Sequence, residues 1–169
     1  MTPWIGPLLP LLALIWPLLL GGLTALPPLG SRAVRLLPLA PLPALWLALA
    51  GGEGVTAVPD LLLGVTLDLD ETRRTLLGMT AALWTVAGLA AQTMAGKPHM
   101  AIFSGFWCLV LSGNLGVFLA LDVGTVYVSF AAVSLASWFL IVQDRTEKAL
   151  HAGRVYIAIA LAGEGALLV

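Results

Sequence analysis

The most unusual position for an ionisable side chain in this sequence is that of Glu164, which lies inside an apolar run. Counted from Arg154, it is about ten residues into a predicted helix, or roughly 15 Å deep at 1.5 Å per residue, near a bilayer midplane. A charged carboxylate is costly there, so we expect it to stay neutral or to exchange a proton with a water-filled path. The structural alternative is a hydrogen bond in a packed interface, or water and headgroups reaching a short terminal helix.

Three neutral polar residues inside apolar runs are further candidates for a proton or ion path. Asn114 needs a hydrogen-bond partner, which we expect to be another helix or an ordered water. Ser134 and Ser137, together with Ala131, give one helix a small and weakly polar face at i, i+3 spacing. Close helix packing is the favoured interpretation of that face.

A second set of small residues favours packing without a path. Ser112, Gly116 and Ala120 recur at four-residue spacing, which forms a small ridge on a helix. Such a ridge lets two membrane helices approach each other closely. We therefore predict a helix–helix contact along these three positions.

Other kinds of site are not indicated by the sequence. It has one cysteine, Cys108, so it can form no internal disulfide and no cysteine cluster for a metal. We find no nucleophile with an adjacent base and no glycine-rich phosphate loop, so we expect no catalytic residues, no metal and no cofactor. The net charge of −1 gives no basic surface for nucleic acid.

The elements that carry these residues are predicted to be membrane helices. Hydrophobic residues make up 60% of the 169 and charged residues 10%, far from the roughly 25% charged of a soluble domain. A span needs about 20 apolar residues. The sequence predicts an all-α, polytopic transmembrane helix bundle of about six helices in a single domain, 1–169. The predicted spans are residues 4–26, 36–51, 75–94, 100–121, 124–142 and 155–169.

The second and third spans are joined by a more polar extracytoplasmic loop, residues 52–74. In it Val65, Leu67 and Leu69 alternate with polar residues, the period-2 pattern of a half-buried strand. The sixth span presents a different problem, because about 15 residues reach only about 22 Å. Either another polypeptide covers this end, or the sequence is one piece of a longer membrane protein.

The loop charges predict an orientation. Most basic residues fall in the loops after the first, third and fifth spans, which all lie on one side of the membrane. By the positive-inside rule that side is cytoplasmic, which puts the N-terminus outside the cytoplasm. The basic residues concerned are Arg32, Arg35, Lys97, Arg145, Lys148 and Arg154.

Several runs in order resemble one family of membrane proteins. They are residues 113–122 (GNLGVFLALD), 134–138 (SLASW) and 146–164 (TEKALHAGRVYIAIALAGE), with 70–74 (DETRR) before them. Together they resemble the antiporter-like membrane subunits of respiratory complex I. The family includes subunits of membrane-bound hydrogenases and of multi-subunit cation/proton antiporters. The resemblance covers residues 60 to 169.

The resemblance implies the N-terminal part of a longer subunit that is built from two inverted halves, each with a proton path. Aligning the SLASW run puts Ala131 where the family usually has a glutamate, and the family's membrane lysines come after residue 169. We therefore expect Glu164 to substitute for the lost acid. The implied location is a bacterial-type cytoplasmic (inner) membrane, and the implied partners are other membrane subunits of a hetero-oligomeric complex together with the lipid bilayer.

Three functions remain open at this point. The first is a subunit of a proton- or cation-translocating complex, which Glu164 favours. The second is a non-conducting structural subunit that anchors or couples a partner enzyme, which Ala131 favours. The third is an independent small transporter, for which the buried polar groups are few.

Overall fold

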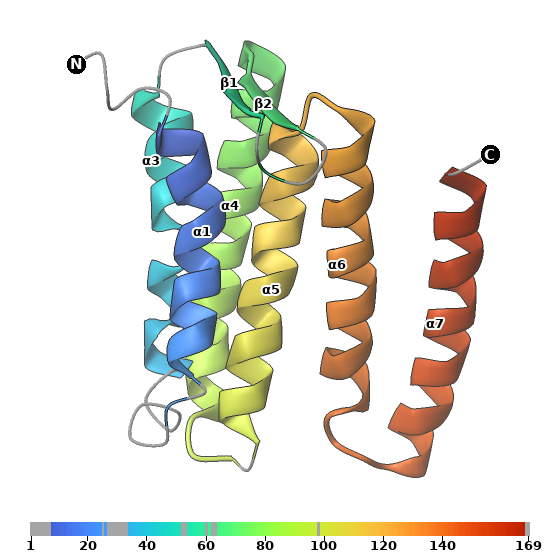
Figure 1. The fold of residues 1–169 in the computed structure, drawn as a ribbon. Coiled ribbons are helices and arrows are strands. Elements are labelled where there is room, and N and C mark those ends of the chain that lie inside the picture. Colours follow the sequence, from blue (N-terminus) through green and yellow to red (C-terminus); the bar gives the residue numbers. More distant parts are fainter. Residues whose placement is uncertain are drawn as a thin grey trace.

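The computed structural model describes residues 8–24, 26, 34–51, 54–59, 61, 64–97 and 99–167. The described residues form six mostly helical segments and one hairpin, arranged as a bundle in Figure 1, which confirms the predicted all-α bundle. The segments are α1 (Leu8–Leu23), the pair η1 (Val34–Leu39) and α3 (Leu42–Ala50), α4 (Glu71–Ala91) continued by η2 (Gln92–Met94), α5 (Met100–Leu119), α6 (Val123–Val142) and α7 (Glu147–Leu167).

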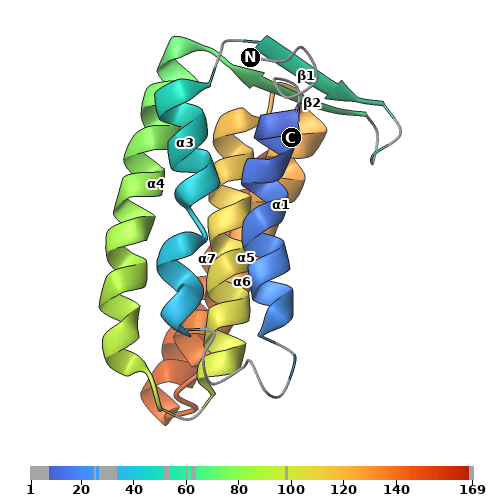
Figure 2. The same ribbon diagram turned by 90° about the vertical axis from the view of Figure 1, so that its left-hand side faces the viewer.

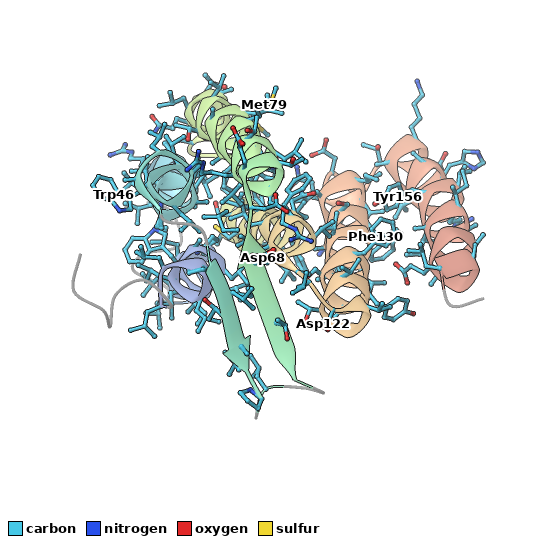
Figure 3. All side chains as sticks on the ribbon, turned by 90° about the horizontal axis from the view of Figure 1, so that it is seen from above. Trp46, Asp68, Met79, Asp122, Phe130 and Tyr156 are labelled. Atoms are coloured by element: carbon cyan, nitrogen blue, oxygen red, sulfur yellow. The ribbon has the colours of Figure 1, made fainter. Side chains whose placement is uncertain are left out.

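Three segments of the described part are long and apolar enough to cross a membrane by length and composition. They are Glu71–Met94, Met100–Leu119 and Val123–Val142, and two shorter apolar segments accompany them. Large apolar side chains also face outward. Trp46 on α3 and Met79 on α4 are examples, and Figure 3 shows both on the outer side of the bundle. Such an apolar exterior suits lipid, and we describe the chain as a multi-pass membrane protein.

Prolines break the second segment into two pieces. Because proline has no N–H to donate, Pro38 and Pro41 interrupt the regular hydrogen-bond ladder. The chain forms η1, turns at Ala40 and Pro41, and starts again as α3. α3 ends at Ala50, and the N–H of Gly51 donates to the carbonyl of Leu47.

A two-stranded hairpin joins α3 to α4. β1 (Gly54–Val58) pairs antiparallel with β2 (Val65–Leu69). In β2 the apolar residues at alternate positions are buried, which confirms the strand predicted from their spacing. β1 is an additional strand that the sequence pattern did not indicate. Figure 2 shows the hairpin lying across one end of the bundle.

α5 lies at the centre of the bundle and α7 lies at its edge. Leu111, Leu115 and Leu119 of α5 are fully buried, and α5 packs against α1, α4 and α6. α7 packs chiefly against α6, which lies between α5 and α7 in Figure 1. Burial of apolar side chains inside the bundle thus centres on α5, whereas α7 is held by one neighbour.

The helix bounds differ from the predicted ones mainly at charged ends. α4 begins at Glu71, because Asp70 caps it by accepting a hydrogen bond from the N–H of Arg73 at 2.7 Å. α7 begins at Glu147, eight residues before the expected start. Its 21 residues extend about 31 Å, but they include Glu147, Lys148 and Arg154, and α7 is not among the three segments of the described part that are long and apolar enough to cross a membrane. Residues 4–7 of the first predicted span lie outside the described part.

Candidate functional site

Glu164 lies on the side of α7 that packs against α6. Gly153 marks this side, because a Cβ added there would collide with Val142 and lie 3.1 Å from Nε1 of Trp138, both on α6. Glu164 follows Gly153 by about three helical turns, so the two residues share a face. They are also the two buried residues of α7 in the described part. The carboxyl group of Glu164 is therefore held at the α6–α7 contact.

Glu164 lies at about the level of the middle of α6. α6 and α7 run antiparallel, and Glu164 is about 16 Å further along α7 than the contact between Gly153 and Trp138. The 20 residues of α6 extend about 30 Å. The depth of Glu164 in a bilayer stays a prediction.

The carboxyl group of Glu164 is incompletely hydrogen-bonded within the described residues. The residue is 8% exposed, and its Oε1 atom is buried without a hydrogen-bond partner there. Buried polar atoms in proteins nearly always have a partner, whether protein or water. Within the described residues, this atom therefore departs from that rule.

Two of the predicted polar residues share the α6 side of this contact or lie next to it. Ser134 is 5% exposed and precedes Trp138 by one turn, which directs it toward α7. Ser137 is half-buried on the adjoining part of α6, and so is Ala131. Ser134 and Glu164 thus lie on facing surfaces, at different heights along the helices.

Asn114 lies on a different face of the bundle. Its Nδ2 donates to the carbonyl oxygen of Val110 at 3.1 Å, so this donor is satisfied within α5 rather than by a second helix. Asn114 follows Trp107 by about two turns and shares its face, and the Trp107 ring packs edge-on against Trp84 of α4, with centroids 4.6 Å apart. Asn114 therefore lies on the α4 side of α5, away from Glu164 on α7.

The small residues of α5 contact three different elements. Ser112 donates its hydroxyl to the carbonyl of Leu14 in α1 at 2.8 Å. A Cβ on Gly116 would collide with the hydroxyl of Ser129 in α6. Ala120 follows the helix and forms a bridge with Leu67 of β2. The ridge is thus divided between α1, α6 and the hairpin.

Among the acidic residues that the structure describes, Asp122 accepts the most hydrogen bonds, and it was not among the predicted sites. It caps α6, and its carboxylate accepts hydrogen bonds from the N–H and hydroxyl of Thr125, both at 2.7 Å, and from the N–H of Thr66 in β2 at 2.9 Å. The Thr125 hydroxyl, and then the two backbone N–H groups, hold the pKa of Asp122 below its ordinary value of 3.8. Figure 3 shows Asp122 beside β2 at the start of α6. An Asp three residues before a Thr, at the start of an apolar run, was the available signal.

No group of three or more His, Cys, Asp or Glu side chains that could hold a metal ion occurs in the described part of the chain. The described residues thus place one buried carboxyl group at the α6–α7 contact, with Ser134 on the facing surface of α6 at a different height.

Comparison with known proteins gives a fold match only. No protein-family model and no curated protein sequence matches the chain. The fold is similar to a chain in the structure of the membrane-bound sulfane sulfur reductase, an archaeal respiratory membrane complex, with a TM-score of 0.71 at 16% identity. The match covers 95% of this chain and 35% of that chain. This chain thus spans little more than a third of the length of the chain it resembles.

Proposed function

We propose that the chain is a membrane subunit of a proton- or cation-translocating complex, related to the antiporter-like subunits of complex I, and that it works with partner chains. The observation that carries the proposal is the fold likeness, which extends over 95% of the chain and involves a chain of a respiratory membrane complex. Because the likeness covers 35% of that other chain, we infer that further polypeptide completes the translocating unit.

Glu164 is the group that we propose to carry a proton. A membrane-embedded acid is expensive unless it has a function, and a proton relay is a common one. Burial at the α6–α7 contact together with an unsatisfied Oε1 supports this role. Ser134 is proposed to border the path on the α6 side, where its hydroxyl can both accept and donate a hydrogen bond. Ser137 and Asn114 are weaker members of the proposed path.

The orientation and the membrane are also part of the proposal. The α4–α5 turn with Lys97 and the α6–α7 turn with Arg145 lie at one end of the bundle in Figure 1, where Lys148 begins α7 beside Glu147. The hairpin, with Asp68 and Asp122 near it, lies at the other end. By the positive-inside rule the basic end is cytoplasmic. We place the N-terminus outside the cytoplasm and the chain in a bacterial-type inner membrane.

Reconstitution tests the proposed function. The complex is purified in mild detergent with its co-purifying chains and placed in vesicles, with and without this chain. We expect proton or cation uptake to fall to the passive leak when the chain is missing and to return when it is added back. Uptake that is unchanged without the chain would contradict the proposal, and purification as a stable isolated oligomer would favour an independent small transporter.

A second function is favoured by one residue. Ala131 occupies the position where the resemblance implies a glutamate, and alanine cannot carry a proton. A subunit that has lost its path and serves to anchor or couple a partner enzyme is consistent with that residue. Such a subunit would be needed for assembly, but translocation would not depend on Glu164.

A further inference from the structure

A cavity of about 280 Å³ with a mixed polar and apolar lining, which includes Met94 and Met100, lies at the basic end of the bundle. It is formed where the α4–α5 turn meets the α6–α7 turn. Lys97 and His99 line it from the first turn, and Gln143, Asp144 and Arg145 line it from the second. Two cationic side chains therefore face one carboxylate, which leaves the cavity with an excess of positive charge.

The backbone holds two of these residues in an uncommon conformation. His99 has φ 65° and Arg145 has φ 51°, and they are the non-glycine residues with positive φ in the described part of the chain. The left-handed region costs roughly 1 to 2 kcal/mol for a residue with a Cβ. Such strain tends to occur at ligand-binding sites, and here both strained residues line the same cavity.

An apolar groove of about 360 Å³ continues from this cavity along the bundle. The two share His99, Gln143 and Arg145 in their linings. Beyond these the groove is apolar, with Ile102 of α5, Trp138 and Phe139 of α6 and Leu150 of α7 on its walls. A basic pocket and an oily groove thus form one continuous amphipathic surface between three helices.

Where the cavity meets the groove, the side-chain oxygen of Gln143 needs a hydrogen-bond donor. The Oε1 atom of Gln143 is buried without a hydrogen-bond partner within the described residues. Gln143 lines both the cavity and the groove. A hydroxyl group on a ligand that crosses from one to the other would satisfy this atom.

We propose that this surface binds one anionic phospholipid. Its phosphate lies between Lys97, His99 and Arg145, and one acyl chain lies in the groove against Trp138 and Leu150. A glycerol headgroup supplies the hydroxyl for Gln143. Basic pockets between membrane helices on the cytoplasmic side are suited to acidic lipids, and the groove gives a reason why a lipid, rather than a free phosphate, is the occupant. This proposal does not depend on translocation.

Native mass spectrometry of the full chain tests the proposal. The chain is released from micelles that contain equal amounts of phosphatidylglycerol and phosphatidylcholine, and the bound lipids are counted. We expect one retained phosphatidylglycerol. In the double variant Lys97→Gln/Arg145→Gln, the ratio of retained phosphatidylglycerol to phosphatidylcholine should fall by about 25-fold, or about fivefold per cation. The matched control Lys148→Gln/Arg154→Gln removes the same charge outside both linings and should keep the preference.

The apolar part has its own variant and control. Leu150→Ser in the groove should weaken retention, whereas Leu161→Ser, at another exposed apolar position of α7, should not. Inorganic phosphate should not displace the lipid. Equal losses in the two double variants would show that net charge alone attracts the lipid and would overturn the proposal. Displacement by inorganic phosphate would also overturn it, because the site would then bind phosphate alone.

Discussion

Glu164 and Asp122 are carboxyl groups with opposite surroundings. Asp122 accepts hydrogen bonds from two threonines, Thr66 and Thr125, which stabilise its charged form. Glu164 is more deeply buried, and its Oε1 accepts none within the described residues. Asp122 therefore serves the fold, whereas Glu164 is the carboxyl group that we propose to carry a proton. Sequence position alone did not separate these roles, because each depends on contacts with a distant segment.

The pH dependence of stability should reveal the role of Asp122. Its pKa is lowered in the folded chain, so its contribution is complete above the ordinary value of 3.8 and is lost as the pH falls through the lowered value. We expect Asp122→Asn to be less stable than the native chain by about 1 kcal/mol at neutral pH, because the amide nitrogen cannot accept the hydrogen bonds that Oδ2 accepts from Thr66 and Thr125. The difference should shrink below pH 3.8. Thermal unfolding in detergent measures it, and a difference that is constant with pH would contradict this account.

At the scale of elements, glycines set the distance between α5 and α6. A Cβ on Gly113 would lie 2.7 Å from Cγ2 of Val133 and 2.8 Å from the backbone oxygen of Ser129. Both distances are too short for a methyl group at Gly113 unless one of the helices shifts. The close approach of these helices holds α6 in place, and α6 in turn positions Ser134 and supports Glu164 on α7.

An alanine at Gly113 should therefore destabilise the bundle. We expect Gly113→Ala to cost about 1 to 3 kcal/mol, because a packed backbone must move. Gly163→Ala is the matched control, since a Cβ on Gly163 of α7 would meet nothing within 4 Å, and it should be neutral or slightly stabilising. Unfolding of both variants in the same detergent gives the comparison. Equal stability of the two would contradict the tight α5–α6 contact.

Hydrophobic runs were sufficient to predict the helices but not all of their starts. The start of α7 was missed because Glu147, Lys148 and Arg154 lower the local hydropathy, although a helix can extend beyond the lipid. Thr146 was the available signal, since its hydroxyl accepts a hydrogen bond from the N–H of Ala149 at 3.1 Å. β1 was not predicted because its residues do not show a clear alternation of buried and exposed positions, and it forms a strand by pairing with β2. The position of Glu164 against α6 required the packing of two helices, which spacing in the sequence does not determine.

At the scale of the whole molecule, the bundle is polarised. The hairpin and Asp122 lie at one end, and the basic cavity with Lys97 and Arg145 lies at the other. α7 stands at the edge and presents apolar side chains such as Ile159 and Leu161 outward. This arrangement suits a membrane subunit with one end on each side of a bilayer. The fold likeness covers 35% of a chain from a respiratory membrane complex, and the proposed function adds partner polypeptides that complete the unit.

Proton flux through the complete assembly with Glu164→Gln tests the central claim most directly. Glutamine keeps the size of the side chain but cannot release a proton, so we expect a fall of at least tenfold, which corresponds to about 1.4 kcal/mol. The control is Glu147→Gln at the exposed start of α7, which should leave the flux unchanged. Unchanged flux with Glu164→Gln, in vesicles holding the same amount of assembled complex, would contradict the account and favour the non-conducting subunit.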